Sequence, residues 1–155
     1  MSTVDEDPFS PTAGLPPAMA EIVEDFRALP EKERLQLLLE FSQGLPPLPP
    51  HLADHPELLE RVDECQSPVF VNVEVDDTAR VHLHVSAPPE APTTRGFAGV
   101  LREGLEGLPA AEVLDLPPDV CSRLGLEQAV SPLRMRGMTG MLARVKRQVR
   151  VATAS

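Results

Sequence analysis

Two stretches of alternating hydrophobic residues, joined by a short polar turn, constrain the fold of this chain most strongly. In "PVFVNVEV" (residues 68–75) valine occupies every second position, and in "RVHLHVSA" (80–87) Val81, Leu83 and Val85 do the same. Because side chains alternate between the two faces of a strand, each stretch presents one apolar face. The residues between them, "DDTA", are typical of a turn. The pattern predicts an antiparallel β-hairpin over about residues 68–87.

Segments before the hairpin have the spacing of amphipathic helices. Helices are expected over about 19–29 and 30–44, where Pro30 suits the start of a helix and Gly44 its end. The proline-rich stretch "LPPLPPHLADHP" that follows is expected to be extended. A short helical turn is expected around Glu57–Arg61.

Helical segments also follow the hairpin. They are expected from Thr93 or Thr94, around 110–114, around 118–124, and from Pro132 with Ser131 as the N-cap. Helices, a hairpin and further helices predict an α+β domain, with helices packed on one face of a small antiparallel sheet. The expected bounds are a disordered, proline-rich tail over 1–18, one domain over 19–150, and a short C-terminal tail over 151–155.

The charge is spread unevenly along the 155 residues. The net charge is −10, yet residues 131–155 contain six basic residues and no acidic one. An acidic body repels phosphates and therefore argues against nucleic-acid binding. The basic end could contact an anion or an acidic partner, although the solvated face of a terminal helix is the favoured explanation.

The chain shows no sign of membrane insertion or secretion in its sequence. No apolar run approaches the roughly 20 residues that a membrane-spanning helix needs. The start of the chain is acidic and proline-rich, unlike a signal peptide. Its two cysteines are too few for a disulfide framework. A cytoplasmic protein with reduced thiols is expected.

Cys65 is the strongest candidate for chemistry, because it lies where a loop becomes a strand. A buried structural cysteine is the alternative. The neighbours Asp63, Glu64, Gln66 and Ser67 are polar, which argues against a position in the core. Asp63 and Glu64 should disfavour the thiolate and leave the thiol weakly reactive until it docks on another protein. Cationic support would require an arginine such as Arg134 or Arg136 to approach it.

The second cysteine and the histidines are expected to play structural parts. Cys121, in "PPDVCSRLGL", shares an apolar pattern with its neighbours and is expected in the core. His51 and His55 have the spacing of a zinc-ligand pair but lie in a proline-rich loop, and His82 and His84 should lie on the polar face of the hairpin. No metal site is expected. No phosphate-binding glycine loop or nucleophile-elbow motif is present, and no bound cofactor is expected.

Three motifs in the order of the chain resemble the SufE family of sulfur-acceptor proteins. "GLPPLP" (44–49) is similar to the family's connection after the second helix, and "CQSPVFV" (65–71) resembles its Cys-Gln-Ser-x-Val motif. "LGLEQAVSPLRMRGMTGML" (124–142) is similar to its Leu-Gly-Leu, Ser-Pro-x-Arg and Gly-Met elements. The resemblance covers about residues 19–149.

The resemblance implies a function for Cys65. It would accept sulfane sulfur from the persulfide of a cysteine desulfurase, a pyridoxal-phosphate enzyme, stimulate that enzyme, and pass the sulfur to an iron–sulfur scaffold. The chain would then be a sulfur-transfer partner rather than a stand-alone enzyme. The family's cysteine loop, here Asp63–Ser67, can be shielded in an apolar cavity and swing out on docking. Arg134 aligns with the family's arginine near that site.

The sequence departs from the family pattern at three positions. Glu64 stands where glycine is common, Leu133 where a small polar residue is common, and Cys121 is an additional thiol. Glutamate would restrict a loop that needs positive φ. The chemistry resembles thiol–disulfide exchange and needs one cysteine. Two distant cysteines cannot supply the several ligands of a cluster, which favours a carrier over a scaffold.

Two other classes of function remain open from the sequence. The first is a cysteine-dependent hydrolase that pairs Cys65 with His82 or His84, although no local motif supports that pairing. The second is a non-catalytic adapter, in which the acidic surface binds a partner and Cys65 is structural. Alkylation of Cys65 would separate the adapter from the carrier, because it would leave an adapter active.

Overall fold

The expected hairpin belongs to a three-stranded antiparallel sheet in the computed structural model, which describes residues 9–154. Its strands are β2 (Phe70–Val75) and β3 (Val81–Ser86), in a register that pairs Val73 with Leu83. A third strand, β1 (Glu60–Arg61), pairs with the outer edge of β2. The expectation of a helical turn around Glu57–Arg61 was therefore wrong at its end. Only a 3₁₀ turn, η1 (Pro56–Leu58), precedes β1.

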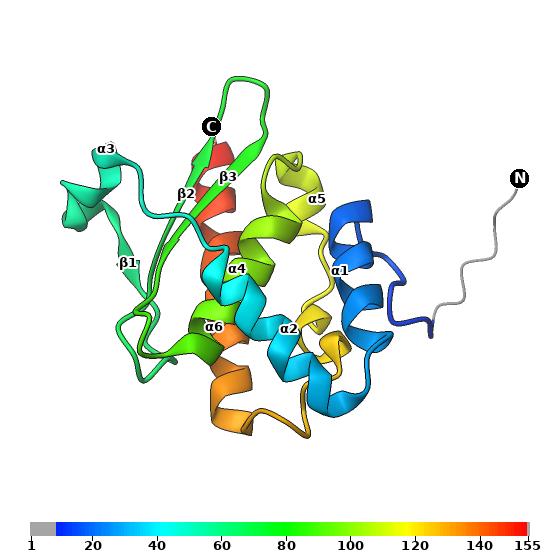
Figure 1. Ribbon diagram of the computed structural model, residues 1–155. Coiled ribbons are helices and arrows are strands. Elements are labelled where there is room, and N and C mark those ends of the chain that lie inside the picture. Colours follow the sequence, from blue (N-terminus) through cyan, green and yellow to red (C-terminus); the bar gives the residue numbers. More distant parts are fainter. Residues whose placement is uncertain (1–8, 155) are drawn as a thin grey trace, which may run out of the picture.

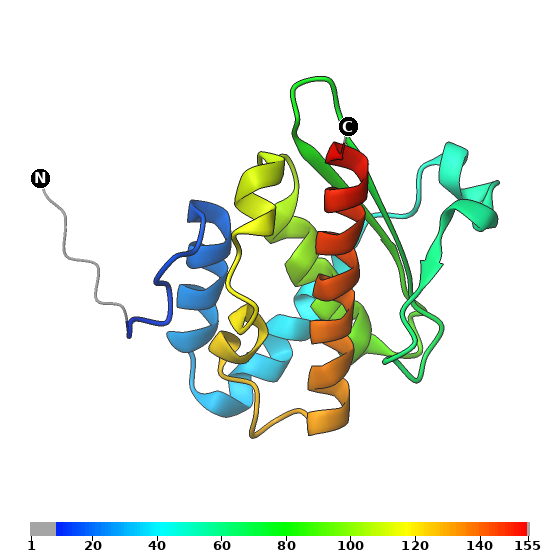
Figure 2. The same ribbon diagram turned by 180° about the vertical axis from the view of Figure 1, so that it is seen from behind.

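The sheet has one buried and one partly exposed face, as the alternation predicts. On the inner face Val71, Val73, Val81, Leu83 and Val85 are buried and Val75 is partly buried. On the outer face Asn72, Glu74, His82 and His84 are half-buried. Two long helices cover the inner face: α6 (Pro132–Thr153) packs on β2, and α4 (Pro92–Leu105) packs on β3. Figures 1 and 2 show the sheet against α6 from opposite sides. The predicted α+β architecture, with helices on one face, is confirmed.

Two N-terminal helices complete the core on the far side of α4. These are α1 (Pro17–Arg27) and α2 (Glu31–Gln43). The helices α2 and α4 approach each other very closely, because α4 carries Gly96 and Gly99 at the contact. A Cβ at Gly96 would lie 2.5 Å from the carbonyl oxygen of Leu38, and one at Gly99 would lie closer still to that of Phe41. Neither glycine could be replaced without separating the two helices.

The remaining short elements agree with the sequence in part. After the hairpin, α5 (Ala110–Leu114) and the 3₁₀ turn η2 (Val120–Leu124) lie where helical pieces were expected. Before it, the stretch expected to be extended contains a four-residue helix, α3 (Pro50–Ala53). Pro50 occupies its first turn, where a missing N–H costs nothing, so this proline-rich sequence permits a helix there. The expectation of an extended connection was wrong at this point.

Secondary structure extends slightly past the expected domain bounds. The helix α1 begins at Pro17, and α6 continues to Thr153. Residues 10–15 form turns, and the Arg123 guanidinium donates to the carbonyl oxygens of Pro11 and Ala13. Residues 1–8 and 155 lie outside the described residues, so the tail expected there stays a prediction. At the start of α6, the Ser131 hydroxyl accepts from the backbone N–H of Arg134, as an N-cap should.

Side chains satisfy strand N–H groups along both edges of the sheet. Beyond the short β1, the N–H of Val73 donates to Oε1 of Gln148, at 2.8 Å. On the other edge, the N–H of Leu83 donates to Oε1 of Glu106, at 3.0 Å. The N–H of Val81 donates to the carbonyl of Leu108. These contacts tie the sheet to α6 on one side and to the loop after α4 on the other.

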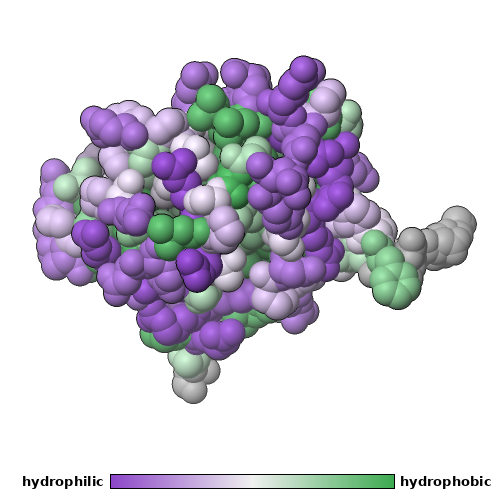
Figure 3. All heavy atoms as spheres, turned by 90° about the horizontal axis from the view of Figure 1, so that it is seen from below, coloured by the Kyte–Doolittle hydropathy of each residue, from purple (hydrophilic) through white to green (hydrophobic). Residues whose placement is uncertain are grey.

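The surface is mainly hydrophilic on the face shown in Figure 3, where hydrophobic residues form separate small areas. No helix among residues 9–154 is both long enough and apolar enough to span a bilayer. The large hydrophobic side chains that are exposed in this part of the chain are Phe9, Leu58, Leu133 and Val151.

Candidate functional site

Cys65 lies in the segment that connects β1 to β2. The N–H of Val62 donates to the carbonyl of Val69 at 2.9 Å, which closes the segment at its ends. Val62 and Val69 are both fully buried and fix these ends in the core. Cys65 is itself buried, with 7% of its surface exposed. The expectation that its polar neighbours keep Cys65 out of the core was wrong, because the chain turns the thiol inward while the neighbours face outward.

Two glycines of α6 provide the space that this segment occupies. A Cβ at Gly137 would lie 2.9 Å from Sγ of Cys65, and one at Gly140 would lie 2.6 Å from Cδ of Glu64. Because these residues are three apart, they lie on the same face of the helix. We call this pair, Gly137 and Gly140, the glycine seat. It lets the thiol and the Glu64 side chain lie directly against the helix backbone.

One arginine connects the same face of α6 to the acidic residues around Cys65. The Arg144 side chain is only 16% exposed and pairs with Glu64. Its Nε lies 3.5 Å from Oε2 of Glu60, and its Nη2 lies 3.8 Å from Oδ2 of Asp63. Arg147 also pairs with Glu60. The acidic neighbours of Cys65 are thus largely compensated by α6, which their sequence positions do not reveal.

The environment keeps the Cys65 thiol protonated near neutral pH. Burial raises the pKa of Cys65 above its ordinary value, and the charge of Glu64 raises it further. Arg144 and Arg61 act in the opposite direction with smaller effect. The expected direction is confirmed, but desolvation is the leading cause, ahead of the acidic neighbours. A thiol in this state is a poor nucleophile until it leaves its buried position.

A pocket of about 330 Å³ adjoins Cys65 and opens towards solvent. It brings together the site residues expected from the sequence: Glu64, Cys65, Gln66 and Ser67 from the connecting segment and Arg134 from α6. Glu90–Thr94, before and in the first turn of α4, and Leu133 and Gly137 complete its lining. Arg136 is not among the lining residues. The pocket is large enough to receive an added sulfur atom beside the thiol.

The sequence analysis missed the part played by Arg144. A signal was available, because Arg144 follows Gly137 by seven residues and Gly140 by four, which places all three on one helix face. Glu64 does not have a positive φ in this structure, and the expected restriction of the loop by Glu64 stays a prediction. Among residues 9–154, Ala79 is the only non-glycine residue with positive φ. Glu64 therefore needs no glycine-like backbone in this conformation.

Cys121 occupies a different environment, in η2. It is 2% exposed, and burial raises its pKa to about 12. The expected core position is confirmed. The Thr139 side chain of α6 lines the same pocket as Cys121 and acts on its pKa in the opposite direction, with smaller effect. Thr139 follows Gly137 by two residues and points away from it, so the two thiols pack on different sides of the helix. Both cysteines are free.

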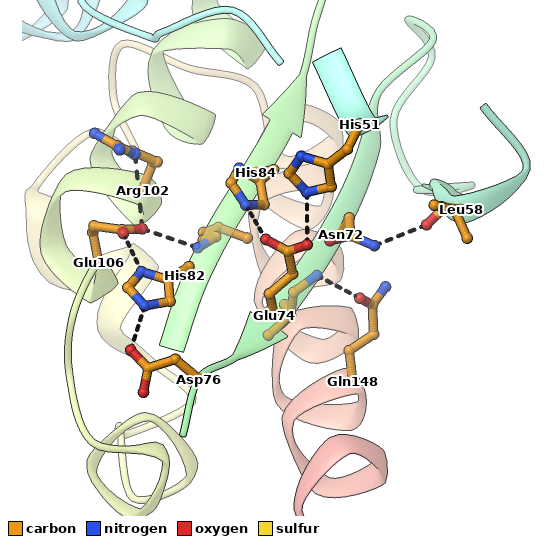
Figure 4. A network of polar contacts seen from close by, with 12 residues as sticks. His51, Leu58, Asn72, Glu74, Asp76, His82, His84, Arg102, Glu106 and Gln148 are labelled. Atoms are coloured by element: carbon orange, nitrogen blue, oxygen red, sulfur yellow. Dashed lines mark hydrogen bonds and ion pairs between the residues drawn. The ribbon is translucent and has the colours of Figure 1, made fainter. Parts of the chain in front are cut away.

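The histidines bind carboxylates on the outer face of the sheet (Figure 4). His82 lies between Asp76 and Glu106, with nitrogen–oxygen distances of 2.8 and 2.6 Å. His51 and His84 both contact Glu74, at 2.8 Å each. No hydrogen bond links Cys65 to a histidine within residues 9–154, so the pairing that a hydrolase needs is not formed. The same residues include no group of three or more His, Cys, Asp or Glu side chains placed to hold a metal ion.

Comparisons with known proteins identify relatives of this chain. A model of the SufE family, described as an Fe–S metabolism associated domain, matches residues 20–149. An uncharacterized SufE-like protein of Mycobacterium tuberculosis (strain H37Rv) is 53% identical over 140 residues, covering 90% of this chain and 96% of the relative. A cysteine desulfuration protein SufE of Plasmodium vivax is 24% identical over 135 residues, covering 85% of this chain and 52% of that protein.

The fold is also similar to a solved structure. The solution structure of a hypothetical protein from Thermus thermophilus matches with a TM-score of 0.80 and 44% sequence identity. The match covers 91% of this chain and 99% of that protein. The three-stranded sheet and its helices are therefore an arrangement shared with a protein of related sequence.

The position of His82 between two carboxylates predicts that the stability of the protein depends on pH. Asp76 and Glu106 raise the pKa of His82 by hydrogen bonds and charge. The stabilisation that they give is complete below the unfolded pKa of about 6.5 and is lost as pH rises through the higher folded value. Urea unfolding at about pH 6 to 9 should show stability falling with pH, and His82→Gln should flatten that fall. His55→Gln, on the exposed connection, is the control, and an equal flattening there would contradict the assignment.

The glycine seat predicts an unusual result for Gly137→Ala. In an ordinary helix interior the change would stabilise the protein by about 1 kcal/mol. Here the new Cβ would force Sγ of Cys65 to move, so we expect no gain in the free energy of unfolding and faster alkylation of Cys65. Gly44→Ala is the control, because its Cβ would meet nothing closer than 3.6 Å. A gain of about 1 kcal/mol in the free energy of unfolding, with an unchanged alkylation rate, would contradict this role of Gly137.

Proposed function

This chain belongs to the SufE family, which is associated with iron–sulfur metabolism, and we propose that it is a sulfur acceptor and carrier whose reactive atom is Sγ of Cys65. The observation that carries this proposal is the contrast between the two thiols. Both thiols border a pocket, but Cys65 lies in a connecting segment beside the Arg134 side chain. Cys121 lies within η2, is only 2% exposed and has a pKa raised to about 12. The sulfur donor would be the persulfide of a cysteine desulfurase. The name of the P. vivax relative, a cysteine desulfuration protein, supports this class of partner.

The proposed reaction is an exchange at sulfur. The Cys65 thiolate attacks the outer, sulfane sulfur of the enzyme's persulfide and forms a new S–S bond at Sγ. The original S–S bond breaks, and the enzyme's cysteine leaves as a thiolate. Cys65 then carries the persulfide, with no net oxidation or reduction and no cofactor on this chain. Removal of the sulfur frees the enzyme's cysteine for its next turnover, which accounts for stimulation of the desulfurase.

Burial of Cys65 fits a thiol that reacts only on a partner. Desolvation disfavours the thiolate in the resting conformation. Outward movement of the segment would return the thiol to a polar environment and lower its pKa. Docking would then activate and expose the nucleophile in one step. The second transfer, to a cysteine of an iron–sulfur scaffold, would follow the same chemistry in reverse roles.

The decisive variant is Cys65→Ser, because serine is nearly isosteric but cannot form a persulfide. We expect it to abolish stimulation, leaving the rate of the desulfurase alone. Mass spectrometry after incubation with a desulfurase and L-cysteine should show one added sulfur on the tryptic peptide 62–80 of the natural chain and none on the variant.

Cys121→Ser is the matched control, and it should retain both the stimulation and the added sulfur. Stimulation that survives Cys65→Ser would instead favour an adapter that acts by binding alone. A sulfur found on peptide 103–123 would assign the reaction to Cys121.

A further inference from the structure

The segment that carries Cys65 is held to the body of the protein by few contacts. Between its buried ends, residues 63–68 make two hydrogen bonds. The N–H of Cys65 donates to the carbonyl of Val62, and the Arg144 guanidinium donates to the Glu64 carboxylate. No hydrogen bond of Gln66 or Ser67 is present within the described part of the chain, 9–154. Arg61 also lies 3.9 Å from Asp63, but this pair is local to the start of the segment. Apart from burial of Sγ, the contacts that hold the segment to α6 are therefore mainly those of Arg144.

Arg144 is well suited to fasten this segment. Its planar guanidinium offers several donors in fixed directions, which match carboxylates better than an ammonium group would. It contacts Glu60 at the end that stays in the sheet, and Asp63 and Glu64 in the segment itself. Gly140 supports this arrangement, because any side chain there would displace the Glu64 carboxylate. The low exposure of Arg144, 16%, reduces screening by solvent.

We propose that Arg144 is a positioning residue for Cys65: through Glu64 and Asp63 it fastens the connecting segment against the glycine seat and keeps the thiol buried until a partner displaces the segment. The proposal deepens the function proposed above and rests on it for its biological meaning. Glu64, which stands where its family commonly has glycine, is then the main residue through which Arg144 holds the segment. A basic partner surface could compete with Arg144 for the same carboxylates and so release the segment.

Arg144 acts on the thiol in two opposing ways that can be measured separately. Its charge favours the thiolate, together with that of Arg61, against burial and Glu64. Its contacts restrict access to the thiol. Glu90 and Arg134 also face the pocket. In a profile of alkylation rate against pH, the midpoint reports ionisation, whereas the plateau above the midpoint reports access of the reagent.

The test measures iodoacetamide alkylation of Cys65 in the free full-length chain, read on peptide 62–80, from about pH 7 to about pH 11. Arg144→Gln should raise the plateau about tenfold, as expected for the combined loss of several partly exposed ion pairs. It should also move the midpoint to higher pH. Glu64→Gln and Gly140→Ala should raise the plateau by a similar factor. Gly140→Ala is the most informative of these variants, because it removes no charge and alanine stabilises a helix better than glycine.

Arg147→Gln is the matched control. It removes the same charge from the same helix, but Arg147 contacts Glu60 and not the segment. We expect its plateau to change by less than about twofold. An unchanged plateau in Arg144→Gln would overturn the proposal, even if the midpoint moved. An equal rise in Arg147→Gln would also overturn it, because it would indicate general loosening of the sheet from α6.

The outcome is independent of the proposed sulfur transfer. No desulfurase is present in the assay, so a failure of sulfur transfer would leave the alkylation result unchanged, and the reverse also holds. If circular dichroism shows that Arg144→Gln does not fold, Glu64→Gln and Gly140→Ala decide. The fastening is supported if both raise the plateau and overturned if either leaves it unchanged.

Discussion

The absence of side chains at two positions of α6 determines how the candidate site can form. Gly137 and Gly140 let the segment after β1 lie against the helix backbone, and the thiol of Cys65 fills the space beside Gly137. Packing is intolerant of extra volume at such contacts. The same helix supports β2 and contributes Arg144 and Arg134. One surface of α6 therefore fixes the sheet, shields the thiol and supplies the charges around it.

The fold uses the same device twice, with different consequences. Gly96 and Gly99 on α4 bring α2 within contact of the helix backbone, and their partners are the backbone carbonyl oxygens of Leu38 and Phe41. That contact joins two helices backbone to backbone. On α6 the partners are a thiol and a carboxylate at the edge of a pocket. Equal spacing of two glycines thus brings helix against helix in one case, and in the other seats the segment whose release is proposed above.

Local patterns predicted most of the secondary structure, and long-range contacts account for the missed strand β1 and for the surroundings of Cys65. The alternation in 68–87 was sufficient to predict the hairpin and its buried face. Ser131 and Pro132 were sufficient to predict where α6 begins. β1 was missed because two residues carry no periodicity, and it exists only through its pairing with β2. The site was predicted as a set of neighbours around Cys65, but its burial and Arg144 depend on a helix some 70 residues later in the sequence.

The capped edges of the sheet bear on how this protein can meet its partners. Gln148 and Glu106 occupy the N–H groups of Val73 and Leu83, so an added strand would find fewer free donors along β2 and β3. This favours a partner that recognises side chains over one that extends the sheet through main-chain hydrogen bonds. Contacts between side chains are more readily exchanged. The carrier proposed above, which would load on one protein and unload on another, needs complexes that dissociate, and the occupied N–H groups favour that turnover.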